Sequence, residues 1–352
     1  MVLPVEVLAE NLRERLGLTG AEIRNLSQVA YGAARRTFLF DLETTDASGR
    51  RAREELVLRL DPEDPDGSLV PSDMKGEFDW YDVAFRAAGV PAPEPLVLEL
   101  DPALLGAPFL VMRRLPGHAD TATMLSAGFD DVREAVATDA MSVLGRIARI
   151  DVDVARDRTG VGGPAGTSDA WRAAIDYWDA LLLEHELGPM PVTRSAVDLL
   201  RDRPPAPSER LVVVHGDYRL GNYLYQRSGV VGILDWEMAH IGDPHEDLAW
   251  ALNETWARTD PSRVWGFLPR ERALDAWQRS SGMTVDENSL AWWTLFSNVK
   301  ATALWIKGAS SVVHGRSDII RYLTNHWSTT VRQEEQTMRA MADLQTYPTT
   351  VR

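Results

Sequence analysis

The residues best suited to chemistry lie in one stretch in the second half of this 352-residue chain. Asp217 and Asn222 follow the short apolar run 211–214, and Asp235 follows a second apolar run, 230–234. A carboxylate within hydrogen-bond reach can orient an acceptor hydroxyl group and accept its proton. Carboxylate and amide oxygens are ligands that suit Mg²⁺. We therefore expect Asp217 to act on an acceptor hydroxyl, and Asn222 and Asp235 to hold Mg²⁺ at the phosphates of ATP.

The spacing of these residues favours phosphoryl transfer. Asp217 and Asn222 are five positions apart, which is the interval between the catalytic base and the metal-binding asparagine of protein kinases. The apolar run before Asp217 predicts a buried strand, and the segments 223–226 and 230–234 predict a hairpin. Because a hairpin reverses the chain, we expect it to return Asp235 to the loop that carries Asp217.

A longer ordered set of residues in the same stretch resembles a known family. The set consists of His215-Gly216-Asp217, Asn222, Asp235-Trp236-Glu237, Gly242-Asp243-Pro244 and Asp247-Leu248-Ala249. It resembles the aminoglycoside phosphotransferase-like, or choline-kinase-like, small-molecule kinases, and most of all the branch whose kinase-like domains are fused to acyl-CoA dehydrogenases. The resemblance implies ATP and Mg²⁺ as cofactors and a hydroxyl group of a small molecule as the acceptor.

The fold that the resemblance implies is α+β and bilobal, like that of protein kinases. It has a small N-terminal lobe with an antiparallel sheet plus a helix, and a larger α-rich C-terminal lobe. We expect residues 1–113 to form the nucleotide-binding lobe, 114–118 to form the hinge, and 119–352 to form the catalytic and substrate-binding lobe.

Hydrophobic periodicity in the chain agrees with this division. In the first lobe it predicts a helix over 4–16, strands over 23–29, 37–42 and 56–60, a helix over 73–88, and strands over 96–100 and 109–112. In the second lobe it predicts helices over 171–184, 292–306 and 319–333.

Two charged residues of the first lobe are candidates for the nucleotide site. Arg59, in the strand 56–60, stands where the resemblance places the phosphate-binding lysine of kinases, and none of the three lysines of the chain lies on this strand. Arginine can bridge a phosphate and a carboxylate. Glu77 borders the inward face of the helix 73–88 and could reach Arg59, as the kinase αC glutamate reaches its lysine.

Two backbone segments are further candidates for contact with the nucleotide. The connection after the first strand contains one glycine, Gly32, whose neighbourhood would cover the phosphates, although an ordinary hairpin turn has the same pattern. At the junction of the lobes, Val111, Met112 and Arg113 would hold adenine through backbone groups, as the resemblance to a kinase hinge implies.

Other polar residues of the family set are interpreted as supports. We expect His215 to anchor its loop through hydrogen bonds to the backbone rather than to act as a base. Asp243 and Asp247 would tie the following helix to the catalytic loop. Glu237 could face the acceptor or the metal, or could act only as a scaffold.

Composition limits the partners of the protein. The net charge of −15 and the pI near 5.0 argue against binding to nucleic acid or to an anionic membrane. The absence of cysteine excludes disulfides and thiolate chemistry, and the seven histidines have no metal-ligand spacing. No apolar stretch is long enough to span a membrane or to act as a signal peptide, so we expect a cytoplasmic protein.

Two alternatives to a small-molecule kinase remain at this point. The single glycine and Arg59 are also consistent with a non-catalytic nucleotide-binding module, or pseudokinase, although Asp217, Asn222 and Asp235 are all present. A protein kinase is disfavoured, because no activation segment ending in a motif like Ala-Pro-Glu follows Asp235. The acceptor could be an aminoglycoside, an amino alcohol, a sugar, a macrolide or a hydroxyacyl compound.

Overall fold

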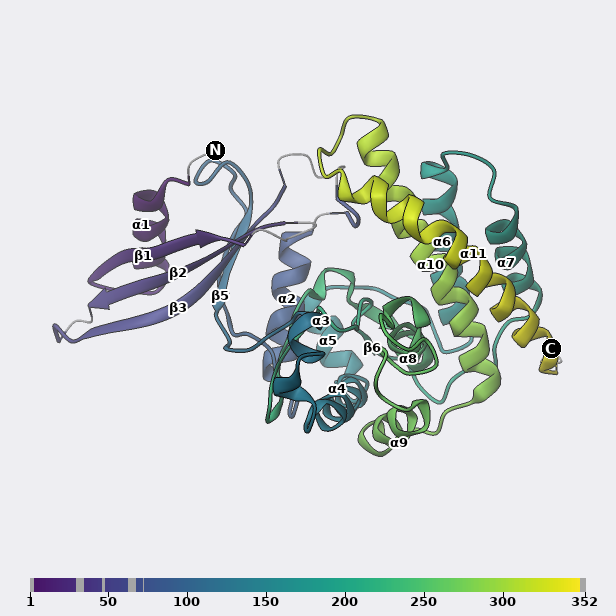
Figure 1. The fold of residues 1–352 in the computed structure, drawn as a ribbon. Helices are drawn as coiled ribbons and strands as arrows, with labels where there is room; N and C mark the ends of the chain where they lie inside the picture. Colours follow the sequence, from purple (N-terminus) through teal and green to yellow (C-terminus); the bar gives the residue numbers. More distant parts are fainter. Residues whose placement is uncertain (1–2, 30–34, 46–47, 63–67, 72, 349–352) are drawn as a thin grey trace.

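The computed structural model of the chain describes residues 3–29, 35–45, 48–62, 68–71 and 73–348. Within these residues a small N-terminal lobe with an antiparallel sheet lies beside a larger, mostly helical lobe (Figure 1). The α+β, bilobal, kinase-like fold expected from the sequence is therefore confirmed.

The sheet of the N-terminal lobe is built from strands that follow one another closely in sequence. Its described strands are arranged in the order β1-β2-β3-β5-β4, with every pair antiparallel. Helix α1 packs its buried Leu8 and Leu12 against this sheet, as the spacing of those leucines predicts. The elements are α1 (Val5–Arg15), β1 (Gly20–Gln28), β2 (Arg36–Thr45), β3 (Arg51–Leu60), β4 (Pro95–Glu99) and β5 (Phe109–Arg113).

Helix α2 (Met74–Arg86) lies between the two lobes. Its N-terminus is capped by Asp73, whose side chain accepts a hydrogen bond from the N–H of Gly76 at 2.8 Å. Its apolar residues, among them Tyr81 and Ala84, join the core of the C-terminal lobe rather than the separate core under α1. The helix therefore fixes Glu77, in its first turn, at the boundary between the lobes.

The C-terminal lobe is a set of helices around two short strand pairs. The helices α6, α10 and α11 confirm the three helices predicted from apolar stripes, although α10 and α11 are longer than predicted. The apolar stripe of α11 continues past the predicted end with the buried Ala340 and Leu344. Helix α10 begins where Asp286 caps it by accepting a hydrogen bond from Ser289 N–H. The elements are α3 (Thr121–Met124), η2 (Ala127–Phe129), α4 (Arg133–Ile147), α5 (Val152–Thr159), α6 (Ala170–His185), α7 (Pro191–Asp202), α8 (Pro244–Leu252), η4 (Glu254–Trp256), α9 (Arg270–Ser281), α10 (Glu287–Val313) and α11 (Arg321–Thr346).

Two antiparallel strand pairs carry the polar residues singled out in the sequence. Strand β6 (Val212–Val214) pairs with β9 (His240–Gly242), and β7 (Tyr223–Gln226) pairs with β8 (Gly229–Ile233). The predicted strand and hairpin are thus confirmed. The pairing of β6 with β9 was not predicted from the sequence. It places the segment after Asp235 beside the loop that follows β6.

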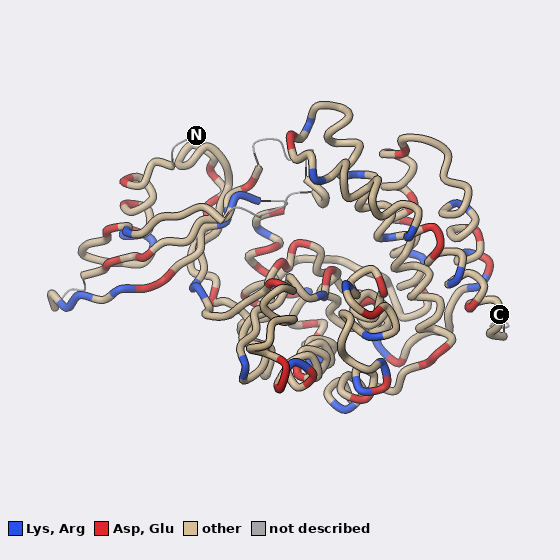
Figure 2. The backbone as a smooth tube through the Cα atoms, viewed as in Figure 1, with Lys and Arg blue, Asp and Glu red and all other residues tan. Residues whose placement is uncertain are grey.

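Charged residues of both signs are distributed over both lobes (Figure 2). No helix among the described residues combines the length and the apolar character that crossing a membrane requires.

Candidate active site

The loop between β6 and β7, here called the catalytic loop (residues 215–222), is held from two sides. Gly216 has a φ of +86°, and a Cβ at this position would lie 2.4 Å from the carbonyl oxygen of Met238. Only glycine therefore allows the two segments to approach so closely. From α8, the Asp247 carboxylate accepts hydrogen bonds from the N–H groups of His215 and Gly216, at 2.6 and 2.9 Å.

The ring of His215 also supports the catalytic loop. Its Nδ1 accepts the N–H of Asp217 at 3.2 Å, and its Nε2 therefore donates to the carbonyl of Leu234 at 2.8 Å. Burial lowers the pKa of His215, which favours this neutral form. The predicted contacts of His215 and Asp247 with the backbone around the loop are present, and Asp243 caps α8 by accepting a hydrogen bond from the N–H of His245.

Asp217 is surrounded by hydrogen-bond donors. Its carboxylate accepts from Asn222 Nδ2 at 2.6 Å, from the indole N–H of Trp250 at 2.8 Å, and from Arg219 Nε at 3.0 and 3.2 Å. These contacts fix the orientation of the carboxylate. The side chain is still partly exposed, with 18% of its surface accessible. The arrangement suits a group that positions a hydroxyl rather than a strong free base.

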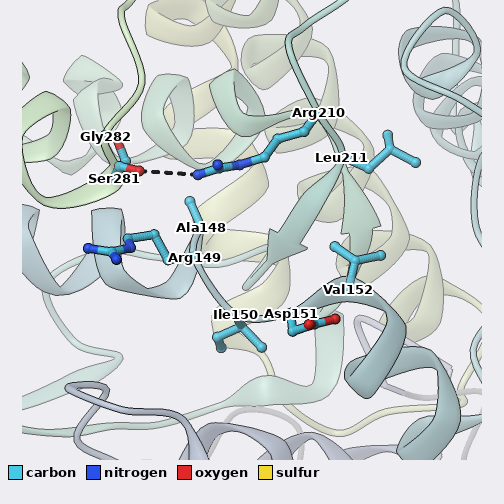
Figure 3. Close-up of a pocket in the computed structure, with 9 residues that line it drawn as sticks. All are labelled: Ala148, Arg149, Ile150, Asp151, Val152, Arg210, Leu211, Ser281 and Gly282. Atoms are coloured by element: carbon cyan, nitrogen blue, oxygen red, sulfur yellow. Dashed lines mark hydrogen bonds between the residues drawn. The ribbon is translucent and has the colours of Figure 1, made fainter.

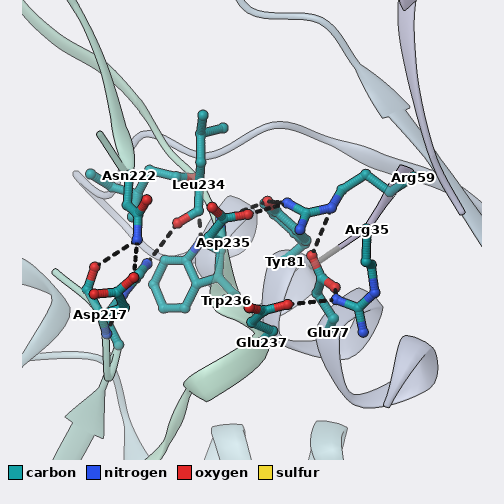
Figure 4. Close-up of polar contacts among 12 residues, drawn as sticks. Arg35, Arg59, Glu77, Tyr81, Asp217, Asn222, Leu234, Asp235, Trp236 and Glu237 are labelled. Carbon is teal, nitrogen blue, oxygen red and sulfur yellow. Dashed lines mark hydrogen bonds and ion pairs between the residues drawn. The ribbon is translucent and has the colours of Figure 1, made fainter. Parts of the chain in front are cut away.

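Asn222 connects the expected base with the expected metal ligand. Its Nδ2 is directed to Asp217, so its Oδ1 is the atom that would face a cation. Its backbone carbonyl accepts the N–H of Leu234 at 2.8 Å, which places the next residue, Asp235, beside the loop (Figure 4). The predicted proximity of Asp217, Asn222 and Asp235 is therefore present in the fold.

Residues of both lobes converge on Asp235. Arg59 Nε lies 3.2 Å from Glu77 Oε1, and Arg59 Nη1 forms an ion pair with Asp235 across the lobe boundary (Figure 4). The hydroxyl of Tyr81 accepts the backbone N–H of Asp235 at 3.0 Å. Glu77 thus reaches Arg59 as its helical position predicts, whereas the contact of Arg59 with Asp235 was not predicted from the sequence.

A second arginine, Arg35, joins the same network. Its guanidinium group pairs with Glu77, with Asp61 at 2.9 Å and with Glu237 at 3.1 Å. Arg35 was missed in the sequence because no periodic pattern marks it. Its one available signal is its position in the sequence, directly before β2 and shortly after Gly32.

The network shifts two carboxyl groups in opposite directions. Burial alone would raise the pKa of Asp235, but the neighbouring Arg59 outweighs it and holds this pKa below its ordinary value. Burial and the charge of Asp235 together raise the pKa of Glu237. Asp235 is therefore the carboxylate that stays ionised most readily and is the better ligand for a cation.

The donor set fits a magnesium ion bound largely by phosphate and water. Among the described residues, no group of three or more histidines and carboxylates could hold a metal by itself. Mg²⁺ commonly needs one or two protein oxygens when phosphates supply the rest, and Asn222 and Asp235 provide such a pair. The network around Asp235 also contains more carboxyl groups than guanidinium groups. The carboxyl groups are those of Asp61, Glu77, Asp235 and Glu237, and the guanidinium groups are those of Arg35 and Arg59.

The remaining predicted nucleotide contacts are less defined. Val111, Met112 and Arg113 lie in β5, which pairs with β3 on one side and β4 on the other, so much of their backbone is already hydrogen-bonded. The side chain of Arg113 pairs with Glu54 and Glu94 on the surface. Their role in binding adenine stays a prediction, and Gly32 lies outside the described residues.

The site belongs to a recognisable family. A model of the phosphotransferase enzyme family matches residues 25–293, which include Arg59, Glu77, the catalytic loop and Asp235. The chain belongs to this family.

Curated relatives of this phosphotransferase-family chain are parts of longer proteins. Acyl-CoA dehydrogenase family member 10 of Mus musculus is 28% identical over 71% of the chain, which covers 22% of that relative. Acyl-CoA dehydrogenase family member 11 of Homo sapiens is 25% identical over 56% of the chain and 25% of that relative. The chain thus spans about a quarter of the length of the relatives that it matches.

Solved structures with the same fold cover nearly the whole chain. A protein of Ralstonia eutropha, provisionally described as an aminoglycoside phosphotransferase, has a TM-score of 0.75 at 18% identity and covers 97% of this chain and 99% of its own. Aminoglycoside phosphotransferase APH(4)-Ia, in a ternary complex with AMP-PNP and hygromycin B, has a TM-score of 0.58 at 18% identity, with 95% and 97% covered.

Two contacts of Asp217 were also not predicted from the sequence. Arg219 lies two positions after Asp217 in the catalytic loop, and that short interval is the signal that could have identified it. Trp250 lies about one helical turn after Asp247 on α8, a spacing that places both side chains on the face toward the loop. Both contact the carboxylate that the sequence assigned to the acceptor.

Proposed function

We propose that this member of the family is a phosphotransferase that uses ATP and Mg²⁺ to phosphorylate a hydroxyl group of a small molecule. The observation that carries the proposal is the convergence of Arg59 and Glu77, from the N-terminal lobe, on Asp235 of the C-terminal lobe, next to Asn222 and Asp217. Phosphoryl transfer depends on positioning and on compensation of charge, and this arrangement supplies both. Residues 1–113 and 119–352 would then be the nucleotide and acceptor lobes, joined by the hinge 114–118.

Each residue has a role that follows from its contacts. Asp217 would hold the acceptor hydroxyl and accept its proton, while Asn222, Trp250 and Arg219 keep its carboxylate in place. Arg59, and Arg35 behind it, would bind the phosphates by donating some of their N–H groups to phosphate oxygens instead of carboxylate oxygens. Bound at Asn222 and Asp235, Mg²⁺ would offset the charge of the triphosphate.

One observation favours the alternative of a non-catalytic nucleotide-binding module. The guanidinium group of Arg59 forms an ion pair with the Asp235 carboxylate, which is the expected metal ligand. For catalysis, Asp235 would have to release Arg59 and bind the metal ion instead.

The decisive experiment combines the protein with ATP, Mg²⁺ and a library of hydroxylated small molecules. Formation of ADP that depends on an acceptor, with a phosphate ester identified by phosphorus NMR, is the expected result. The Asp235→Asn protein is the matched inactive control. Nucleotide binding by calorimetry without transfer to any member of the library would favour the non-catalytic module.

A further inference from the structure

A cavity of about 340 Å³ lies between the α6–α7 connection and the helices α10 and α11. These helices pack side by side in the part of the C-terminal lobe remote from the sheet (Figure 1). Most of the lining is apolar or aromatic, and its larger apolar side chains are Met190, Trp305, Ile306, Val313, Leu323 and Trp327. The volume and the lining are those of a site for a small organic molecule.

A row of aromatic rings connects this cavity with Asp217. The indole N–H of Trp250 donates to the Asp217 carboxylate, and the ring of Trp250 lies 5.0 Å from that of Trp256. The ring of Trp256 in turn lies 6.4 Å from that of Trp305, which forms a wall of the cavity. The guanidinium group of Arg219 lies 4.9 Å from the ring of Trp256 and also contacts Asp217. A series of ring contacts therefore leads from the acceptor carboxylate to the wall of the cavity.

The lining of the cavity carries little charge. Glu334 is the one carboxylate among the described lining residues, and the lining includes no lysine or arginine. Burial lowers the pKa of His326, another lining residue, so its neutral form is favoured near pH 7. At the other end of the row, Arg219 pairs with Asp217, so the negative charge that could attract a cationic acceptor is already compensated.

The rim of the cavity exposes a large aromatic surface. Trp327 on α11 lines the cavity and yet has 70% of its surface accessible to solvent. The other cavity of note, about 550 Å³, lies where Leu211 precedes β6, at the end of this strand away from the catalytic loop, and is lined by polar groups such as Arg149, Asp151 and Arg210 (Figure 3). The cavity at Trp305 is thus the one that combines apolar surface with a connection to Asp217.

We propose that the cavity at Trp305 and Trp327 binds the apolar body of the acceptor, so that the substrates are uncharged alcohols with an extended apolar part. The hydroxyl group of such a molecule would lie at Asp217, and its chain would pass Trp256 to end in the cavity. This inference rests on the proposed function, and it separates the chain from phosphotransferases that act on polycationic aminoglycosides.

Binding without nucleotide tests the cavity independently of catalysis. We expect calorimetry to show binding of octanediol. Butanediol should bind with at least tenfold lower affinity, because each methylene group that becomes buried raises the affinity about fourfold. Aminooctanol should also bind with lower affinity than octanediol. Binding should become less endothermic or more exothermic on warming, as burial of apolar surface gives a negative heat-capacity change. Equal affinity for aminooctanol and octanediol, or for butanediol and octanediol, would overturn the inference.

Variants on α11 locate the binding site. Trp327→Ala should weaken octanediol binding about tenfold, and Thr330→Phe, which fills the cavity from its lining, should remove binding. Val331→Ala is the matched control, because Val331 lies on the same helix, is 78% exposed and is outside the lining. Unchanged affinity in both cavity variants, with thermal stability retained, would overturn the inference.

Transfer assays distinguish a failure of this inference from a failure of the proposed function. With ATP and Mg²⁺, kcat/KM for a series of diols should rise with chain length, and Trp327→Ala should raise the KM for the diol without changing kcat or the KM for ATP. Transfer to hydrophilic acceptors with no effect of chain length would overturn the cavity assignment and leave the kinase activity standing. Binding of octanediol at the cavity without transfer to any acceptor would support the cavity and overturn the proposed function.

Discussion

The two sides of the candidate active site hold their polar groups in different ways. On the nucleotide side, Arg35 and Arg59 are buried and paired with carboxylates from both lobes. On the acceptor side, Asp217 accepts hydrogen bonds from the neutral Asn222 and Trp250 and from the partly exposed Arg219, and a row of aromatic rings leads away from it. Under the proposed function, the nucleotide side would meet the high and constant charge of a triphosphate, whereas on the acceptor side the shape and polarity of the site would select the acceptor.

This difference has an energetic consequence. A buried ion pair is costly to break by removal of one partner, because the other charge is left without compensation. Changes on the nucleotide side should therefore affect both stability and catalysis, while changes at the aromatic row should alter the KM for the acceptor. The predictions below test this contrast, starting with the largest expected effect on turnover.

Asp235→Asn should reduce turnover about a thousandfold, because an amide supplies no charge to a metal at this position. The fold should persist, since Asp235 has a φ of 60° and asparagine adopts this left-handed conformation readily, but it should be less stable because Arg59 loses the charge of Asp235. Turnover is measured at saturating Mg²⁺, and folding by thermal denaturation. A variant with turnover near that of the wild type would contradict the assignment of Asp235 as a metal ligand.

Asp217→Asn should lower kcat by a factor of about 10² to 10⁴, the usual contribution of a general base, and leave ATP affinity unchanged. The amide can still accept hydrogen bonds from Trp250 and Arg219, so the loop should keep its conformation. Single-turnover kinetics and nucleotide titration check the two halves of the prediction. Loss of ATP binding would instead place Asp217 on the nucleotide side.

Arg59→Ala should weaken ATP turnover by about 1.5 to 3 kcal/mol, the range of hydrogen bonds to charged groups, and Arg59→Lys should restore part of the loss. Glu77→Gln should act in the same direction but more weakly. The double variant should lose less than the sum of the single losses, because Arg59 and Glu77 share one ion pair.

Arg53→Ala is the matched control for this double-mutant cycle. Arg53 lies on the same strand, β3, with 56% of its side chain exposed, and pairs with the buried Asp41. Its loss should change turnover little, because this ion pair does not belong to the network around Asp235. Strictly additive losses at Arg59 and Glu77 would show that they do not act together.

Glu246→Gln should have the smallest effect on turnover and act mainly on stability. Glu246 is buried below the catalytic loop between Lys300, at 3.1 Å, and His240, at 3.0 Å. Burial opposes its ionisation, but these two cations lower its pKa from 4.5 to about 2. Because the pKa is depressed in the folded state, the ionised group stabilises the fold fully above about pH 4.5, and this stabilisation is lost as the pH falls toward 2.

Urea denaturation at several pH values checks this prediction. The difference in unfolding free energy between the wild type and Glu246→Gln should be largest near pH 6 and should shrink below pH 4.5. A difference that does not change between pH 6 and pH 3 would show that the ionised carboxylate of Glu246 does not stabilise the fold.

Local spacing in the sequence was enough to identify the catalytic loop and much of the fold. The interval from Asp217 to Asn222 and the hairpin before Asp235 depend on contacts between near neighbours, and the apolar stripes of α1, α2, α6, α10 and α11 depend on helical periodicity. The contact of Glu77 with Arg59 could also be predicted, because the position of each side chain within its element fixes the direction in which it points.

Tertiary structure alone decided which distant residues complete the site. Arg35 and Glu237, or Arg59 and Asp235, are more than 170 positions apart, and they meet because α2 packs into the core of the C-terminal lobe and closes the two lobes on each other. The sequence also left open which tryptophans of the second lobe belong to the core and which line a pocket: Trp292 and Trp293 are fully buried in the core, whereas Trp305, on the same helix, lines the cavity. Periodicity shows that a side chain faces inward, but only the packing of the neighbouring helices determines whether it meets another side chain or a space for a ligand.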